Sequence, residues 1–211
     1  MAYSDFNLSE IKDRFQIVLE DATRLFPEVE PVPISHFLRE VLEENVPLAL
    51  AIHTEKARSE MIVTPILIEV RKLLDRRISL FSGVEFNVDK EQGLNGICDY
   101  LISLSKEQLY ISAPVVALVE AKNDNLKSGL AQCAAEMIAA RIFNEQKQNS
   151  IEIIYGVVTT GSNWRFLKLV ENRLYIDIQE YYLEQLGVLV GILLKMLSVS
   201  IEAESPSRLP S

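Results

Sequence analysis

Apolar residues recur every three or four positions over residues 8–25, and this spacing predicts an amphipathic helix near the start of the chain. Asn7 and Glu10 form a capping box in front of this helix, because each side chain can accept a hydrogen bond from the backbone of the other residue. A proline-rich stretch, residues 27–33, follows and is expected to end the helical pattern.

Ser35 is a favoured capping residue and predicts the start of a second, shorter helix. This helix is expected to end near Asn45, because Pro47 lacks the backbone N–H that a helix interior needs. The two helices together predict an N-terminal helical accessory region, residues 1–53.

A third helical pattern covers residues 54–74, and Pro65 is expected to kink it. Glu60 lies in line with its apolar stripe, where an unpaired charge is costly to bury, so it is a candidate functional residue. Glu69 lies more than a third of a turn away and is expected to face solvent. The stripe consists of Val63, Leu67, Val70 and Leu74.

The remaining segments predict an α/β (α+β) fold with a mixed central β-sheet flanked by helices. An unbroken apolar run, residues 115–119, is typical of a central strand that is covered on both faces. From residue 54 onward the predicted order is helix, three strands, helix, strand, hairpin, helix. These segments are strands at 84–88, 94–103 and 115–119, a helix from the caps at 123–125 to about 148, a strand at 151–160, a hairpin of 164–170 with 173–178, and a helix at 183–199.

The chain has 211 residues and a hydrophobic content of 48%, which is enough for one buried core. We therefore expect a single domain over residues 1–204 and a flexible tail over residues 205–211. Cys98 and Cys133 are interpreted as small core residues, and a chain of this size without need of disulfides fits a cytoplasmic location. The longest apolar run, residues 187–194, is shorter than the roughly 20 residues of a membrane span, so no membrane association is expected.

The formal net charge of −9 is evidence against general binding of polyanions, since Lys and Arg supply most non-specific affinity for nucleic acids. A locally basic channel is nevertheless compatible with an acidic body. The densest basic cluster is interpreted as a solvated face rather than as a phosphate-binding surface; it consists of Arg71, Lys72, Arg76 and Arg77.

The triplet Glu-x-Lys occurs three times, at residues 10–12, 120–122 and 145–147. The first and third lie in predicted helices, where residues two apart point in different directions. The second ends the apolar strand, where Glu120 and Lys122 share a face and lie about 6 to 7 Å apart along the chain. Only the second triplet therefore predicts a carboxylate and an amine that act together.

Asp99 interrupts an otherwise apolar run in the preceding predicted strand, on the face that also holds Ile97 and Leu101. A carboxylate at such a position needs a polar partner or a metal ion. With Glu120 and Lys122 it forms a candidate metal-binding and catalytic group.

With these residues, the chain resembles the PD-(D/E)XK, or restriction endonuclease-like, nuclease superfamily, whose core order is helix, three strands, helix, strand. The first acidic residue of the motif falls on Asp99, the second on Glu120 and the lysine on Lys122. The proline that names the motif is absent, because Cys98 precedes the aspartate.

The resemblance spans a nuclease-like core over residues 54–178 and leaves a C-terminal helix, residues 179–204, outside it. Residues 155–166 are similar to the corresponding segment of uncharacterised members and of the nuclease domain of type I restriction enzyme subunits. Some members add a glutamine on the helix after the motif, which matches Gln132 in this sequence.

The resemblance implies a Mg²⁺-dependent endonuclease that hydrolyses DNA phosphodiester bonds, with Mn²⁺ as a substitute metal. Asp99, Glu120 and the carbonyl of Ala121 are then the metal ligands, and Glu60 holds a second ion or an ion-bound water. Lys122 orients or deprotonates the attacking water. Hard oxygen ligands favour Mg²⁺ over zinc, and both histidines lie outside the motif.

Two other functions fit the same residues: a binding or regulatory module without turnover, and a structural domain in which Glu120 and Lys122 form an ion pair. DNA rather than RNA as the substrate follows from the superfamily alone. Gly187 and Gly191 predict close helix packing, either within the fold or in a homodimer, and Trp164 is expected to attach the hairpin to the core.

Overall fold

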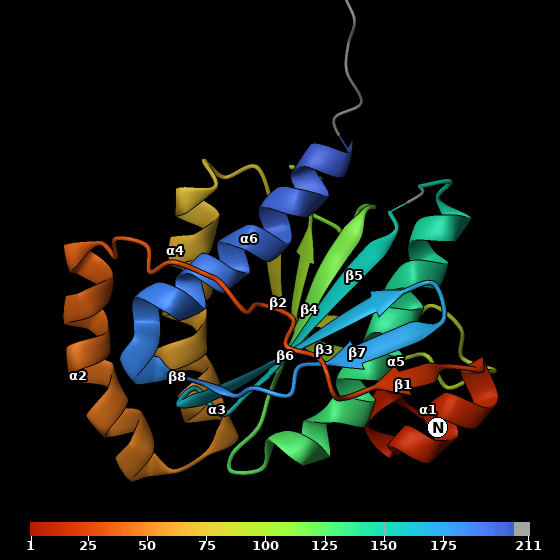
Figure 1. Ribbon diagram of the computed structural model, residues 1–211, viewed down its shortest axis with the longest axis horizontal. Coiled ribbons are helices and arrows are strands. Elements are labelled where there is room, and N and C mark those ends of the chain that lie inside the picture. Colours follow the sequence, from red (N-terminus) through yellow and green to blue (C-terminus); the bar gives the residue numbers. More distant parts are fainter. Residues whose placement is uncertain (150, 205–211) are drawn as a thin grey trace, which may run out of the picture.

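The computed structural model describes residues 1–149 and 151–204, and through their centre runs one mixed eight-stranded β-sheet (Figure 1). The strands lie in the order β1-β7-β6-β5-β4-β3-β2, and β8 pairs with β6. The prediction of a mixed sheet flanked by helices is confirmed. The strands are β1 (Val18–Glu20), β2 (Ser79–Glu85), β3 (Ile97–Ser103), β4 (Val115–Ala121), β5 (Ile153–Thr159), β6 (Asn163–Val170), β7 (Arg173–Ile176) and β8 (Tyr181–Tyr182).

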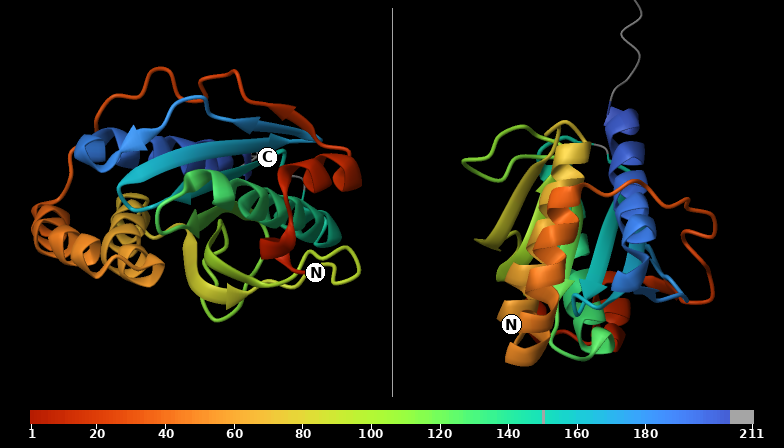
Figure 2. Two further views of the ribbon diagram at one scale, coloured as in Figure 1. Left: turned by 90° about the horizontal axis from the view of Figure 1, so that it is seen from below. Right: turned by 90° about the vertical axis from the view of Figure 1, so that its left-hand side faces the viewer.

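Helices cover both faces of this sheet (Figure 2). The long helix α5 packs with α1 on one face, while α2, α4 and α6 pack on the other, so the sheet separates two apolar cores. The helical segments are η1 (Tyr3–Asp5), α1 (Leu8–Phe15), α2 (His36–Ile52), α3 (Glu55–Arg58), η2 (Ser59–Val63), α4 (Thr64–Leu73), α5 (Leu126–Gln146), η3 (Leu183–Gln185) and α6 (Leu186–Glu204).

Strand β4 is buried at every position, as its unbroken apolar run predicts. It is antiparallel to β3 and parallel to β5, and α5 makes the connection between the two parallel strands. Asn144 of α5 fixes the start of β4, because its side chain accepts from the N–H of Val115 (2.8 Å) and donates to the carbonyl of Val115 (2.7 Å). The helix and the strand are thus held in a fixed relation that determines where the far end of β4 lies.

The predicted helix over residues 8–25 is wrong in its second half. The Asn7 and Glu10 capping box forms as expected, but α1 ends at Phe15, and Gln16 adopts a left-handed conformation with φ of 54°. The chain then forms β1, which pairs in parallel with β7. Pairing of backbone groups at the open sheet edge outweighs a local apolar spacing that both structures can satisfy.

The predicted end of the second helix near Asn45 is also wrong, because α2 continues through Pro47 to Ile52. Pro47 and the residue one turn before it, Glu43, are both exposed, so the carbonyl that the proline leaves without a helical partner is accessible to water. Beyond the proline, Ala49 is fully buried and holds the last turns against the core.

The helical stretch from Thr54 is continuous, and a π-helical turn, η2, replaces the expected kink at Pro65. The carbonyl of Met61, which Pro65 cannot bond, accepts instead from the side-chain amide of Asn45 (3.0 Å). The hydroxyl of Tyr100 on β3 bonds the Ser59 carbonyl in this wide turn (2.9 Å). A π turn contains about one residue more than an α turn and therefore changes which side chains face the core.

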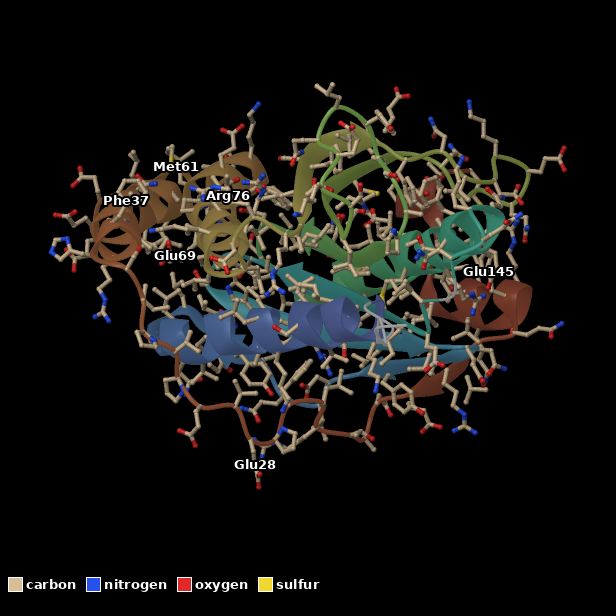
Figure 3. The ribbon with its side chains drawn as sticks, turned by 90° about the horizontal axis from the view of Figure 1, so that it is seen from above. Glu28, Phe37, Met61, Glu69, Arg76 and Glu145 are labelled. Carbon is tan, nitrogen blue, oxygen red and sulfur yellow. The ribbon has the colours of Figure 1, made fainter. Side chains whose placement is uncertain are left out.

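This change of register corrects the prediction for Glu60, whose side chain does not continue the apolar stripe. It is 61% exposed and pairs with Lys56 at 3.6 Å. The prediction for Glu69 is wrong in the opposite sense, because Glu69 is 3% exposed. Its carboxylate accepts from the N–H of Ser35 (3.1 Å), and this bond joins α4 to the start of α2. The same carboxylate pairs with Lys72 within α4 (3.7 Å); Figure 3 labels Glu69.

Two arginines of the basic cluster bond backbone carbonyls near the end of α4. Arg71 donates to the carbonyl of Ile78 (3.1 Å) and Arg77 to that of Leu74 (3.2 Å). Together with the pairing of Lys72, these bonds stabilise the turn after α4.

The apolar segment Leu183–Ile201 is long and apolar enough to cross a membrane by length and composition alone. In this fold its hydrophobicity is explained by packing, since residues such as Leu189, Leu193 and Met196 are buried in the core. A Cβ at Gly191 would lie 3.0 Å from the carbonyl oxygen of Glu30, so this glycine permits close packing within the fold. The tail, residues 205–211, lies outside the described residues.

The hairpin prediction is confirmed: β6 and β7 are antiparallel, and Trp164 is fully buried with its indole N–H donating to the carbonyl of Gly161 (2.9 Å). Cys98 and Cys133 are free and buried, as expected of core residues.

Candidate functional site

The end of β4 and the middle of the neighbouring strand β3 bring three of the predicted residues together. Asp99 lies on β3, and its carboxylate accepts from the backbone N–H of Ala121 on β4 (2.8 Å). Glu120 and Lys122 flank that alanine. The aspartate therefore has the polar partner that its position requires, and this bond fixes it beside the Glu-x-Lys triplet.

Glu120 and Lys122 form a direct ion pair between the Glu120 Oε1 and the Lys122 Nζ. Both are largely shielded from water, with side-chain exposures of 1% and 18%. Gly129 of α5 makes room for the lysine, since a Cβ there would lie 3.1 Å from the Lys122 Cγ and 2.7 Å from the Cγ1 of Val158. The small residue thus allows α5 to lie directly over the ion pair.

Gln132, which the sequence leaves open between a solvated helix residue and a site residue, also reaches this group. Its side-chain oxygen accepts from the Lys122 Nζ (3.3 Å), and its amide nitrogen donates to Glu136 one helical turn further on (3.3 Å). Glu120, Lys122, Gln132 and Glu136 therefore form one chain of side-chain contacts from the strand end into α5.

Glu136 is a member of this group that the sequence reasoning missed. It is 0% exposed, although it is a carboxylic acid in the middle of a helix. A signal was present: Glu136 is the single charged residue in the stretch Ala134–Ala140, whose other members are apolar and buried. A carboxylate within such a stretch needs a partner inside the protein, which here is Gln132.

Burial sets the electrostatics of these acids. Desolvation, followed by the nearby Asp99 carboxylate, raises the pKa of Glu120 from 4.5 to about 8. Desolvation and then Glu120 raise the pKa of Glu136, and desolvation raises that of Asp99. Burial lowers the pKa of Lys122, but the adjacent Glu120 carboxylate outweighs it, so the net shift is upward and the ammonium form is favoured.

A pocket of about 260 Å³ opens beside Asp99 and Ala121. Glu55 and Glu60 lie on its opposite wall, which α3 and η2 form. Glu60 thus lines the same pocket as Asp99, although its carboxylate pairs with Lys56. The π turn, rather than the helical spacing, gives Glu60 this position.

The donors at this site fit a hard divalent cation in part. Glu120 Oε2 and Glu136 Oε2 are buried and lack hydrogen-bond partners within the part of the chain that the structure describes, which is costly for carboxylate oxygens. Three acids, Asp99, Glu120 and Glu136, face one ammonium group, so added positive charge would be stabilised here. Over the described residues, however, no group of three or more His, Cys, Asp or Glu side chains is placed to hold a metal ion.

Comparison with protein-family models, curated proteins and solved structures finds no match to this chain. The functional argument therefore depends on the site itself.

Proposed function

We propose that this protein is a Mg²⁺-dependent nuclease that hydrolyses DNA phosphodiester bonds, with Mn²⁺ able to replace Mg²⁺. One observation supports this above all others. Asp99, Glu120 and Lys122 come from two adjacent strands and meet at the strand end, where Asp99 is fixed by a backbone N–H and Lys122 by Glu120 and Gln132. Carboxylates that can hold a metal ion beside a hydrogen-bond donor provide one arrangement that supports metal-assisted hydrolysis.

The order of elements supports a restriction endonuclease-like core as part of this proposal. A helical stretch precedes three antiparallel strands, β2, β3 and β4; α5 follows, and β5 then pairs in parallel with β4. This is the order that the resemblance implies. The N-terminal segments, β6, β7 and α6 extend the sheet and cover it.

In the proposed site, Asp99, Glu120 and the Ala121 carbonyl would hold the metal ion, and Glu60 would contribute from the far wall of the pocket. The ion supplies a Lewis acid that offsets the charge developing on the phosphate. Carboxylate and carbonyl oxygens are ligands that Mg²⁺ prefers.

Lys122 acts as a donor in this proposal and not as a base. The net shift of its pKa is upward, because the nearby carboxylates together outweigh desolvation, so Lys122 keeps its proton at neutral pH and donates hydrogen bonds. It can therefore orient the attacking water and stabilise negative charge on a phosphate oxygen. Gln132 restricts the ammonium to one position, since it accepts one of its hydrogen bonds.

The test is cleavage of plasmid and linear DNA by the purified protein with Mg²⁺, with Mn²⁺ and with EDTA. We expect metal-dependent cleavage that Glu120→Ala reduces by at least ~10³-fold, because loss of metal binding removes several kcal/mol of transition-state stabilisation. Glu145→Ala is the matched control, because Glu145 belongs to another Glu-x-Lys triplet and its side chain is 66% exposed. Equal activity of the two variants would remove this assignment.

The alternative, a binding module without turnover, is favoured by one observation, the tight engagement of Lys122 with Glu120. Calorimetry with Mg²⁺ distinguishes the nuclease and the binding module, which both bind the metal ion, from a purely structural domain. Mg²⁺ binding that Asp99→Asn abolishes, without DNA cleavage, would support the binding module. Absence of Mg²⁺ binding in the unsubstituted protein would support the structural role.

A further inference from the structure

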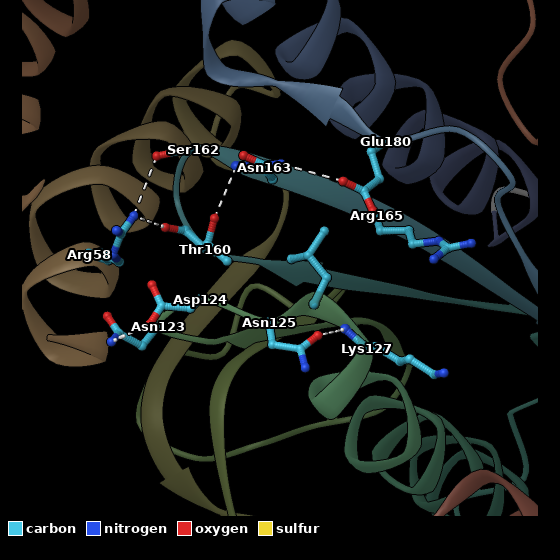
Figure 4. Close-up of a pocket in the computed structure, with 11 residues that line it drawn as sticks. Arg58, Asn123, Asp124, Asn125, Lys127, Thr160, Ser162, Asn163, Arg165 and Glu180 are labelled. Carbon is cyan, nitrogen blue, oxygen red and sulfur yellow. Dashed lines mark hydrogen bonds between the residues drawn. The ribbon is translucent and has the colours of Figure 1, made fainter. Parts of the chain in front are cut away.

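A second pocket, of about 510 Å³, lies beside the loop that follows β4 (Figure 4). The loop that follows Lys122 forms its floor and leads into the N-terminus of α5. The hairpin between β5 and β6 and the helix α3 form its walls. The backbone N–H of Lys122 bonds the Thr159 carbonyl on β5 (2.7 Å), so this pocket adjoins the proposed catalytic group.

Arg58 is the central feature of this second pocket. Its side chain is buried, with a residue exposure of 8%, and it donates to the Thr160 carbonyl (3.1 Å) and to the Ser162 hydroxyl (3.4 Å). One of its terminal nitrogens also lies 3.5 Å from the Nδ1 of His53. Among the described residues, its Nε has no hydrogen-bond partner. Over the described residues, no carboxylate lies within 4.0 Å of the guanidinium group, so a buried positive charge here is not neutralised by the protein.

Two more cations line the same pocket without an ion pair to any described residue: Lys127 in the first turn of α5 and Arg165 on β6. The pocket also contains two acids, so three cations face two carboxylates, and each carboxylate has a polar partner of its own. Asp124 pairs with His53 (3.6 Å), and Glu180 accepts from the amide of Asn163 (3.4 Å).

The start of α5 adds to this positive field. The first N–H groups of a helix lack helical partners and together carry about half a positive charge. Asn125 caps the Lys127 N–H (2.9 Å), and the rest of the first turn faces the pocket through Leu126 and Lys127. In a protein with a net charge of −9, this is a concentration of unpaired positive charge next to a cluster of acids.

We propose that this pocket binds a phosphate group of a polynucleotide strand. The choice of a polynucleotide as the ligand rests on the proposed function. The pocket would bind the substrate at a second phosphate, beside the phosphodiester that reacts. Arg58 and Ser59 are consecutive in sequence and line different pockets, so one helical wall separates the phosphate site from the pocket that contains Asp99. A guanidinium group suits phosphate because its N–H groups match two phosphate oxygens.

The experiment measures binding of a short fluorescent single-stranded DNA by anisotropy in EDTA, over a series of salt concentrations. Cleavage plays no part in this readout. We expect Lys127→Gln to weaken binding several-fold and to reduce the salt slope by about one, as for the loss of one phosphate contact. Arg58→Gln should weaken binding roughly tenfold or more, since hydrogen bonds to charged groups are stronger.

Lys147→Gln is the matched control, because Lys147 ends the same helix, is exposed and lies outside the pocket. It should leave affinity and salt slope unchanged. Should Arg58→Gln fail to fold in a thermal melt, Lys127→Gln and Arg165→Gln decide the question. Equal binding by Lys127→Gln and Lys147→Gln, or no binding of DNA by the unsubstituted protein, would overturn the phosphate site.

Two further arms identify the source of the phosphate. If Lys127→Gln binds more weakly only to 5′-phosphorylated DNA, the pocket binds a terminal phosphate. If it binds 5′-hydroxyl DNA more weakly as well, the pocket binds an internal phosphate. Both outcomes support the site. Binding of inorganic phosphate, measured by calorimetry, without any binding of DNA would contradict it. Weaker DNA binding by Lys127→Gln in a protein that cleaves nothing would keep the phosphate site and remove the nuclease proposal.

Discussion

Two copies of the Glu-x-Lys triplet show how strongly position changes the chemistry of the same residues. At 120–122 the triplet ends a buried strand, and its glutamate and lysine form an ion pair with side-chain exposures of 1% and 18%. At 145–147 it ends α5; Glu145 is 66% exposed and lies 3.9 Å from Arg141, not from Lys147 (Figure 3). Side chains two apart share a face on a strand but not on a helix.

The two triplets also differ in how much an ion pair affects the stability of the protein. An exposed ion pair contributes about 0 to 1 kcal/mol to stability, because water and salt screen it. A buried pair contributes little net stability, yet removal of one partner leaves an uncompensated charge at a cost of several kcal/mol. The same substitution should therefore change the free energy of unfolding far more at residues 120–122 than at residues 145–147.

The largest difference is expected for the two lysines. Lys122→Ala leaves the buried Glu120 without its cation and should destabilise the protein by about 3 kcal/mol at pH 8, whereas Lys147→Ala should cost less than about 0.5 kcal/mol. At pH 5 the cost for Lys122→Ala should be smaller, because a protonated Glu120 needs no cation. Urea unfolding at both pH values measures this, and equal costs for the two lysines would contradict the role of burial.

A smaller effect is expected for Glu136, through the pH dependence of stability. The raised pKa of Glu136 means that the folded protein holds a proton that the unfolded chain releases above about 4.5, so unfolding releases a proton and stability falls as pH rises above about 5. Glu136→Gln removes one such acid. It should make this slope shallower, by at most about 1.4 kcal/mol per pH unit, and stabilise the metal-free protein at pH 8.

The measurement is urea unfolding in EDTA at several pH values. Glu145→Gln serves as its control and should reproduce the original slope, since this side chain is exposed. A steeper slope in Glu136→Gln, or a protein less stable than the original at pH 8, would show that the buried acid stabilises the fold instead.

The smallest effect is expected for Gln132→Ala, which removes one neutral acceptor from Lys122 and one donor to Glu136, an acid whose raised pKa favours the uncharged form. It should cost about 1 kcal/mol in stability, or about tenfold in any metal-dependent cleavage, because Glu120 still holds the ammonium group. Unfolding and cleavage assays on the same preparation measure both. Loss of activity as large as that of Glu120→Ala would mean that Gln132 contacts the substrate itself.

Much of the sheet could be predicted, because strand β4 and helix α5 have patterns that leave one interpretation. The unbroken apolar run before Glu120 requires cover on both faces, and the small residues of the next helix allow that cover to approach closely. The site residues Asp99, Glu120, Lys122 and Gln132 follow from these patterns together with the superfamily resemblance. Their proximity in the structure agrees with that prediction.

The predictions that failed concern residues whose environment is made by distant parts of the chain. Val18 pairs with Arg173, far along the sequence, and no local spacing reveals that the sheet edge is open there. Glu69 is buried because Ser35 supplies its backbone N–H, and Glu60 is exposed because Tyr100 helps to stabilise a π turn beneath it. Glu136 is buried because the sheet covers that side of α5, which the local sequence of the helix does not reveal.

The sequence by itself determined the strand that ends in Glu120 and Lys122, since alternation of side chains along an extended backbone is a local property. Only the tertiary structure decided which charges are buried and which pocket each one faces. The reason is physical: periodicity depends on a few neighbouring residues, whereas desolvation and pairing depend on every segment that folds over a side chain.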